Sequence, residues 1–376
     1  MASPAVFSLS IHADYRCRHS GQCCSVDWDV PVELPVYRSL TEAMTAGRLA
    51  VASDAAAFAP FTVGPELPEE APAIFGRTEA GACVFFERNS RLCIVHRDLG
   101  ETALAHTCRH FPRVAVHDAR GTFIALSHFC PTAASMLFRE DVPLEIVSAP
   151  PAFPPGDYEG LTVGRDEYPP LLHPRMLMDH DGYSAWEQHM VRRCADVQRV
   201  PETVLATLRR DAERLASWRP GDATLRAAVF ALPAGYVEGI PHVTLDDSLS
   251  FHAECLTAVP EELMPEPDGD GLPDAFREHV VPVWHTVHAP LNRYIAAKAF
   301  ASWTAYQGRG VCTIVQGIEA AVALVRVEAA RQCRDTGRPL DDELLLEAFR
   351  SADFILNHLA AGDALAENWG RGIGEY

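Results

Sequence analysis

The chain has 376 residues, of which 48% are hydrophobic, so it can bury one large core or two ordinary ones, and overall disorder is excluded. Its formal charge of -19, from 51 acidic and 32 basic side chains, disfavours binding to nucleic acid or to anionic lipid surfaces. No segment approaches the roughly 20 apolar residues that cross a bilayer, and the first residues lack the pattern of a secretion signal. We therefore expect a cytoplasmic protein without a nucleic-acid or membrane partner.

In chain order, the first predicted elements are a helix over 32–47 and a strand over 121–126, with much loop between them. Prolines crowd the stretch 149–174, which predicts an ordered connector without helix, because proline lacks a backbone donor and blocks the preceding turn. Beyond it, apolar residues recur three and four positions apart. This spacing predicts helices over 176–197, 202–218, 291–305, 311–334 and 340–359.

These elements predict an α+β fold that is mainly α. We expect a cysteine-rich, metal-binding N-terminal domain with short strands over 1–145, since small domains with modest cores often draw folding free energy from bound metal. A proline-rich connector over 146–174 should lead from it to an all-α helical domain over 175–376.

Cysteines are concentrated near the start of the chain. Thiols stay reduced in the cytoplasm, so clustered cysteines there indicate metal binding or catalysis rather than disulfides. Seven of the eleven lie in the first 130 residues, and all seven are candidate metal ligands: Cys17, Cys23, Cys24, Cys83, Cys93, Cys108 and Cys130.

The local sequence around the first five of these cysteines favours convergence. Gly21 precedes the double cysteine and can adopt backbone angles that a side chain forbids, which suits a tight turn. Cys83 and Cys93 flank the loop 87–91, which indicates a hairpin that carries both thiols to one end.

The last two cysteines lie beside prolines. Cys108 is followed by Arg109, Pro112 and Arg113, so the helix should end there and positive charge should lie near the thiolates, lowering their pKa. Pro131 suits the first turn of a helix, so Cys130 should sit beside exposed amides at the positive end of the helix dipole.

Seven thiols exceed the number that one tetrahedral zinc ion requires, and four soft thiolates suit a 4Fe-4S cluster. An iron-sulfur cluster is therefore the first interpretation. Zinc or mononuclear iron is the alternative, because ligand softness admits all of them. Ordinary buried cysteines are the third reading, and spacing alone does not assign individual ligands.

At this point the motifs resemble a known family. Cys17 with Gly-Gln-Cys23-Cys24, the Cys83 and Cys93 pair, and Cys108-Arg-His-Phe-Pro are similar to the YkgJ-type cysteine-cluster family, described as zinc- or iron-chelating. The segment Ser127-His-Phe-Cys-Pro-Thr-Ala-Ala134 further resembles its FliB-like branch, the flagellin lysine N-methylases, which also have a long helical C-terminal part. The resemblance covers about residues 15–140 and implies an iron-sulfur cluster, with S-adenosylmethionine as methyl donor to protein lysines.

Two functions follow as hypotheses. The first is a FliB-like protein-lysine N-methyltransferase that acts on a protein substrate. The second is a non-catalytic zinc- or iron-binding module of the YkgJ type, in which the metal organises a scaffold for partner proteins. The sequence has no glycine-rich turn between a strand and a helix, so neither catalytic nor cofactor-binding residues are assigned.

Overall fold

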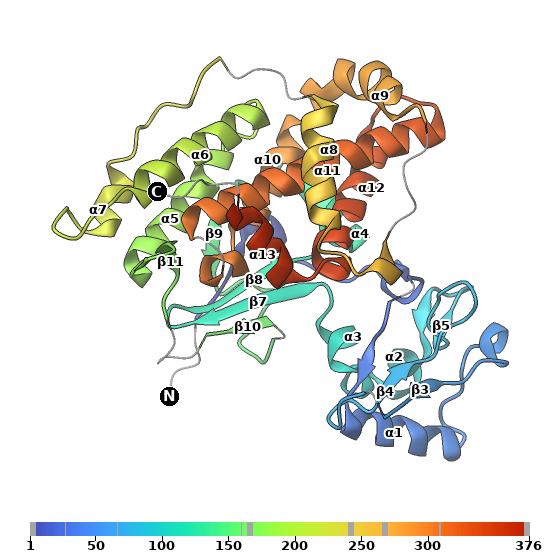
Figure 1. The fold of residues 1–376 in the computed structure, drawn as a ribbon. Helices are drawn as coiled ribbons and strands as arrows, with labels where there is room; N and C mark the ends of the chain where they lie inside the picture. The colour runs from blue at the N-terminus through green and yellow to red at the C-terminus, as the bar shows by residue number, and fades with distance from the viewer. Residues whose placement is uncertain are drawn as a thin grey trace.

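The computed structural model describes residues 5–26, 28–65, 67–158, 160–163, 168–239, 244–264, 270–307 and 310–371. The protein is about 51% helical and 12% strand, which confirms the predicted mainly helical α+β class. Figure 1 shows two lobes. The small lobe contains the elements from α1 to α3, and the large lobe contains the helices from α4 onward with the strands they pack against.

The described helices are α1 Leu34–Thr45, α2 Ile94–Leu99, α3 His106–His110, α4 Pro131–Ser135, α5 His180–Cys194, α6 Pro201–Ala216, α7 Leu225–Phe230, α8 Leu245–Leu256, α9 Leu272–Ala275, α10 His288–Ala299, α11 Val311–Thr336, α12 Asp342–Phe354 and α13 Gly362–Arg371. The strands are β1 Val6–Leu9, β2 Pro31–Val32, β3 Phe61–Val63, β4 Ala73–Phe75, β5 Phe86–Glu87, β6 Leu92–Cys93, β7 Arg113–Asp118, β8 Gly121–Leu126, β9 Ile146–Ser148, β10 Gly160–Thr162, β11 Leu171–His173 and β12 Met176–Leu177.

A five-stranded sheet in the order β10-β7-β8-β1-β9 forms one layer of the large lobe. Its central hairpin is antiparallel, with Arg113 opposite Leu126 and Asp118 opposite Gly121. β1 runs parallel to β8 and β10 runs parallel to β7, whereas β9 is antiparallel to β1. The sheet therefore joins three segments that lie far apart in the sequence.

The predicted domain boundaries differ from this arrangement. The stretch 146–174 is not a linker, because β9 and β10 lie in it and form the two edges of the sheet. Leu9, Val116 and Phe123 of the sheet share one hydrophobic core with the long helices. The helices of the part predicted to be all-α therefore pack on strands from the first 126 residues. The sequence does not reveal this arrangement, because pairing between distant strands has no local sequence pattern.

α11 is the central helix of the large lobe. Buried residues run along most of its length, and it packs against α6, α8, α10 and α12, as Figure 1 shows. It ends at Thr336, and the next residue, Gly337, has a left-handed backbone (φ 67°) that glycine adopts without strain. The prediction of a helix over 311–334 is therefore confirmed, and the apolar periodicity around the whole helix is explained by burial on all sides.

Capping side chains set the starts of two other predicted helices. The Asp341 side chain accepts a hydrogen bond from the Leu344 amide at 3.0 Å, so α12 starts at Asp342. Asp179 accepts one from the Gly182 amide at 2.7 Å, so α5 starts at His180. The predicted start at residue 176 was too early, because residues 176 and 177 form β12 against β11.

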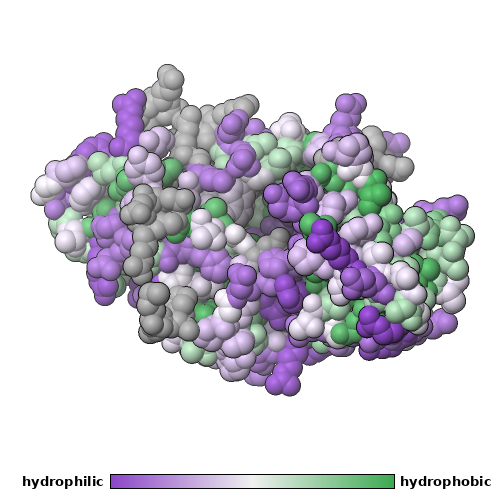
Figure 2. Space-filling view, turned by 90° about the horizontal axis from the view of Figure 1, so that it is seen from below, coloured by the Kyte–Doolittle hydropathy of each residue, from purple (hydrophilic) through white to green (hydrophobic). Residues whose placement is uncertain are grey.

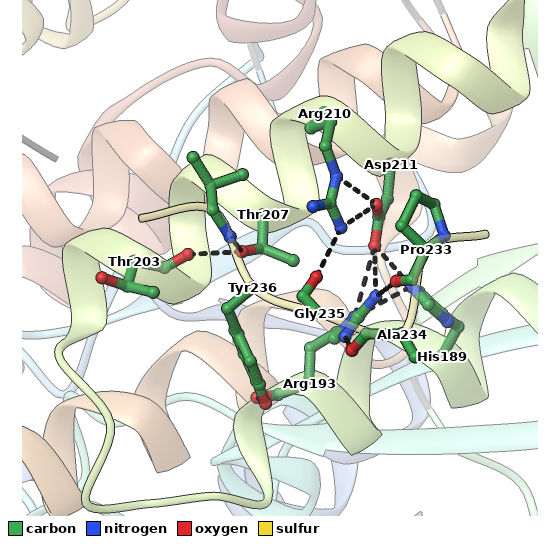
Figure 3. A network of polar contacts seen from close by, with 11 residues as sticks. His189, Arg193, Thr203, Thr207, Arg210, Asp211, Pro233, Ala234, Gly235 and Tyr236 are labelled. Carbon is green, nitrogen blue, oxygen red and sulfur yellow. Dashed lines mark hydrogen bonds and ion pairs between the residues drawn. The ribbon is translucent and has the colours of Figure 1, made fainter. Parts of the chain in front are cut away.

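A buried polar network around Asp211 fastens α5, α6 and the segment 233–237 to one another (Figure 3). Asp211 is fully buried and accepts hydrogen bonds from His189 Nε2 at 2.8 Å and from a terminal nitrogen of Arg193 at 3.0 Å. Arg210 also donates to it, at 2.7 Å, and to the Gly235 carbonyl at 3.0 Å. One carboxylate thus holds three side chains, and two of them, Arg193 and Arg210, in turn bind backbone carbonyls of residues 233–235.

The small lobe has its own hydrophobic cluster, built from residues between Val30 and Ala105. It contains α1, a three-stranded sheet in the order β2-β4-β3 and the β5-β6 hairpin. Figure 2 shows the protein from below. Hydrophilic residues are spread over this face, and groups of hydrophobic residues lie among them. Among the described residues, no helix is both long enough and apolar enough to span a bilayer.

Candidate metal centre

All eleven cysteines lie in the described part of the chain, and all are free thiols. Five of the seven predicted ligands are brought into one neighbourhood in the small lobe: Cys23, Cys24, Cys83, Cys93 and Cys108. The other two, Cys17 and Cys130, lie together elsewhere. The four remaining cysteines, Cys194, Cys255, Cys312 and Cys333, are buried or half-buried in the large lobe.

The turn before the double cysteine is tight, as its sequence predicts. Gly21 has a left-handed backbone (φ 76°) and is followed by a 3₁₀ turn over Gln22–Cys24. A Cβ atom at Gly21 would lie 2.5 Å from the ring of Phe86, so glycine also permits this turn to pack closely on β5. The thiols of Cys23 and Cys24 are 3.8 Å apart as a result.

The next two thiols come from the predicted hairpin. β5 and β6 pair antiparallel, with Phe86 opposite Cys93, which confirms the hairpin around the loop 88–91. The Cys83 amide donates a hydrogen bond to the Cys24 carbonyl at 2.8 Å, so the hairpin is tied directly to the double-cysteine turn. Backbone hydrogen bonding therefore fixes the approach of these segments even though the thiols themselves are free.

Arg77 is the arginine that serves this centre. Its guanidinium donates to the carbonyl oxygens of Val26 at 2.7 Å and Gly81 at 3.2 Å, and also to that of Trp28. It therefore links the chain after the double cysteine to the chain before Cys83. Its positive charge acts to lower the pKa of the Cys83 thiol, although burial outweighs this effect.

The sequence predicts this positive charge on Arg109 and Arg113. Arg113 instead lies over the rings of Tyr15 and Phe153, at 5.7 and 5.8 Å from their centroids. Arg77 was missed because it is six positions before Cys83, where no short motif marks it. A short turn pairs Arg77 with Cys83 in an antiparallel β-bridge, and contacts with the more distant Val26 and Trp28 fix its guanidinium.

Burial dominates the ionisation of these thiols. It raises the pKa of Cys83 to about 11 and also raises the pKa values of Cys93 and Cys108. Cys108 is exposed by area, yet the protein around it is dense enough to raise its pKa well above the ordinary value, and nearby Cys83, Cys93 and Cys23 add to that rise. Without metal, these groups are therefore mostly protonated thiols at neutral pH.

The adjacent thiols of Cys23 and Cys24 have pKa values shifted in opposite directions. A hydrogen bond from the Cys24 thiol lowers the pKa of Cys23, and the same contact, together with burial, raises the pKa of Cys24. Cys23 is thus the first thiol of the group to ionise. Among the described residues, no three His, Cys, Asp or Glu side chains are already arranged as a closed metal-binding set. Metal binding would require four of the five thiols to turn toward one point and to release protons.

Cys17 and Cys130 form a separate pair with Tyr15. The Tyr15 hydroxyl lies 3.6 Å from the Cys130 sulfur, and Cys17 is close enough to raise the pKa of both groups, after burial. Cys130 directly precedes α4, whose first residue is Pro131, as predicted. Amides at the start of α4 hydrogen-bond to the Cys130 sulfur, and they act to lower the thiol pKa, which burial nevertheless raises.

An aromatic group joins the small lobe to the large lobe beside the five-thiol centre. Trp28 donates a hydrogen bond from Nε1 to the Cys23 carbonyl at 3.1 Å. Its ring packs edge-on against His358, Phe129 and Phe111, at centroid distances of 4.6, 5.5 and 5.4 Å. No short sequence pattern marks this group, because its members come from four separate segments.

Comparisons with protein-family models, with curated proteins and with solved structures give no match for this chain. Its family is therefore a matter for proposal. A groove of about 400 Å³ opens on the large-lobe side of the aromatic group, with Phe129, Phe354 and Leu263 in its walls. Arg350 lies at this groove, donates to the Phe129 carbonyl at 3.1 Å and is paired with Glu347.

Proposed function

We propose that the five-thiol neighbourhood of the small lobe is a metal centre and that four of its thiolates hold a 4Fe-4S cluster. The observation that carries this proposal is the meeting of Cys23, Cys24, Cys83, Cys93 and Cys108 from four separate segments. Soft thiolates are the ligands that iron-sulfur clusters use. Five available thiols leave one beyond the four that the cluster needs.

The residues fit such a group chemically. Cys23 is the thiol that ionises first, and Arg77 offsets negative charge beside Cys83 and Cys108. The remaining thiols would lose protons on binding, so affinity should rise with pH. Zinc is the alternative occupant, because four thiolates also satisfy a tetrahedral structural site.

For the whole protein we propose a metal-binding protein of the YkgJ type, in its FliB-like branch. In that case the chain transfers methyl groups from S-adenosylmethionine to protein lysine. The groove beside Phe129 supports a site for one of these reactants, since it is of ligand size and Phe129 also packs against Trp28. Trp28 also binds the Cys23 carbonyl, so it links this aromatic group to the turn whose thiols would hold the cluster.

The alternative is a non-catalytic module in which zinc or iron organises the small lobe. The short helices and strands of the small lobe favour a structural metal, since β5 and β6, for example, have only two residues each. Ligands of a structural metal would supply folding free energy that so small a core lacks. Partner proteins would then bind the organised surface.

The two proposals differ in what the purified protein contains. Protein isolated without oxygen should be brown and carry iron with acid-labile sulfide if it holds a cluster. Cys83→Ser and Cys108→Ser should lose the metal, because oxygen is a harder and poorer ligand. Cys194→Ser and Cys255→Ser remove buried thiols of the large lobe and should retain full metal content.

Colourless protein with one zinc ion would support the structural module instead. Metal content unchanged in both Cys83→Ser and Cys108→Ser would overturn the centre itself. Titration calorimetry with S-adenosylmethionine, performed on the metal-loaded protein, then tests the methylase proposal. Binding supports the enzyme, and its absence together with an intact cluster supports the module.

A further inference from the structure

The groove beside Phe129 combines aromatic walls with charged groups of both signs. Its volume of about 400 Å³ lies within the range of roughly 300–1,000 Å³ that is typical of small-molecule sites. Two of its walls are the rings of Phe129 and Phe354, whose centroids are 4.9 Å apart. The charged residues that line it come from α11 and α12 and are Glu328, Arg331, Glu347 and Arg350.

These charged groups form two ion pairs, one on each helix. Arg331 pairs with Glu328 along α11, and Arg350 pairs with Glu347 along α12. The side chains of Arg331 and Arg350 are only 15% and 11% exposed, so both guanidinium groups are held close to the protein. The four charges sum to zero. A ligand that carries charge of one sign would be attracted by one pair member and repelled by the other, whereas a ligand with both signs can satisfy both.

Arg350 is held in place and still has donors for a ligand. Its Nε donates to the Phe129 carbonyl at 3.1 Å, and its central carbon lies 5.4 Å from the centre of the Phe129 ring. A guanidinium group has five N–H donors, and the bonds to Phe129 and Glu347 are those that it forms within the described part of the chain. Glu347, 39% exposed, is the most exposed of the four charged side chains. The pair therefore offers donors and acceptors side by side.

We propose that this groove binds a zwitterionic α-amino acid that carries a flat aromatic group. The ligand carboxylate accepts hydrogen bonds from the Arg350 guanidinium, and the ligand ammonium donates to the Glu347 carboxylate. The aromatic group packs on the rings of Phe129 and Phe354.

This inference rests on the proposed function, in which the small reactant is S-adenosylmethionine. That compound has the required chemistry, because it joins an amino-acid zwitterion to an adenine ring. Its positively charged sulfonium group lies between the two parts, and aromatic faces such as those of Phe129 and Phe354 attract cations. The groove is thus the site of the methyl donor.

The substrate lysine suits this groove less well. A lysine side chain in a protein segment brings a positive charge without a carboxylate, so Arg331 and Arg350 would repel it. Its alkyl chain also lacks a flat surface to match the rings of Phe129 and Phe354. The balance of charges therefore favours the methyl donor over the methyl acceptor as the occupant.

Titration calorimetry of the metal-loaded, full-length protein tests the inference with three probes. S-adenosylmethionine and S-adenosylhomocysteine both carry the zwitterion and the adenine ring, whereas 5′-methylthioadenosine lacks the amino-acid part. We expect the first two to bind. Methylthioadenosine should bind on the order of 100-fold more weakly, because two charge-assisted hydrogen bonds are lost.

Substitutions in the ion pair should act only on probes that carry the zwitterion. Glu347→Gln and Arg350→Gln should each weaken S-adenosylhomocysteine binding about tenfold and leave the affinity for methylthioadenosine unchanged. The matched controls are Glu343→Gln and Arg338→Gln, which alter an ion pair near the start of α12. Neither of these described residues lines the groove, so both controls should bind all probes like the wild type.

Ser351→Leu narrows the groove itself and should weaken the binding of all three probes. Circular dichroism and metal content show whether this variant and Arg350→Gln have folded. S-adenosylhomocysteine binding that is unchanged in Glu347→Gln, Arg350→Gln and Ser351→Leu would overturn the inference and leave the methylase proposal standing, since the cofactor would then bind elsewhere.

Equal affinities for S-adenosylhomocysteine and methylthioadenosine would also overturn the inference, because the zwitterion would then not be recognised. If neither S-adenosylmethionine nor S-adenosylhomocysteine binds the metal-loaded wild type, the inference and the methylase proposal fail together, and the metal centre is unaffected.

Discussion

The ring of Trp28 in the small lobe packs edge-on against the imidazole of His358 in the large lobe, with their centroids 4.6 Å apart. The same indole binds the Cys23 carbonyl through Nε1, and His358 Nε2 lies 3.0 Å from the Ser127 hydroxyl oxygen. One pair of rings therefore connects the backbone of the five-thiol centre with the sheet and helices of the large lobe.

Trp28 and His358 should be energetically coupled. In a double-mutant cycle with Trp28→Leu and His358→Leu, we expect a coupling free energy of about 1 kcal/mol, as for other aromatic pairs in contact. Urea unfolding measures each variant. Trp218→Leu, at the end of α6, combined with His358→Leu serves as the control pair and should be additive. Additivity in the Trp28 pair would show that the ring contact does not join the lobes.

Asp211 should be a major contributor to the stability of the large lobe. Asp211→Asn leaves Arg193 and His189 without their buried anion (Figure 3), so the free energy of unfolding should fall by about 3 kcal/mol. Chemical denaturation provides the value. Asp222→Asn changes an exposed carboxylate and should alter it by less than about 0.5 kcal/mol. Equal effects of the two substitutions would contradict the role of the network.

His358 should make the protein acid-sensitive in a defined range. Burial lowers its pKa to about 4, so it stays neutral in the folded protein while the unfolded chain takes up a proton below about pH 6.5. The unfolded state then binds more protons, and stability is lost as pH falls from about 6.5 to about 4, by up to about 3 kcal/mol.

Comparison with His358→Gln isolates this contribution, because His12 and His128 also have lowered pKa values and act in the same direction. The difference in unfolding free energy between the wild type and His358→Gln should shrink or reverse in favour of the variant as pH falls. A difference that is constant between pH 7 and pH 4 would mean that His358 is not held neutral.

The separation of Cys17 from the five-thiol group predicts different effects of two similar substitutions. Cys108→Ser should lose most of the bound metal, because this thiol lies near Cys83, Cys93 and Cys23. Cys17→Ser should retain it, since Cys17 lies with Tyr15 and Cys130. Elemental analysis of both variants decides the point. Loss of metal in Cys17→Ser would place that thiol among the ligands.

Elements with a local cause could be predicted from the sequence. The hairpin between Cys83 and Cys93, the strand β8 and the long helix α11 depend on turn residues and on apolar periodicity within one segment. The left-handed turn at Gly21 belongs to the same class. Neighbouring residues interact whatever the rest of the chain does, so these features can be read without a fold.

The sequence by itself also determined which side chains could serve as ligands, because only cysteine supplies a thiolate. The tertiary structure alone decided which of them meet. Pairing of β1 with β8 spans more than a hundred residues, and the contacts of Arg77, Trp28 and Arg350 likewise depend on distant segments. Such contacts form only when the whole chain has packed. Hydrophobic burial brings distant segments together, but it is not directional, so no local pattern in the sequence shows which residues will meet.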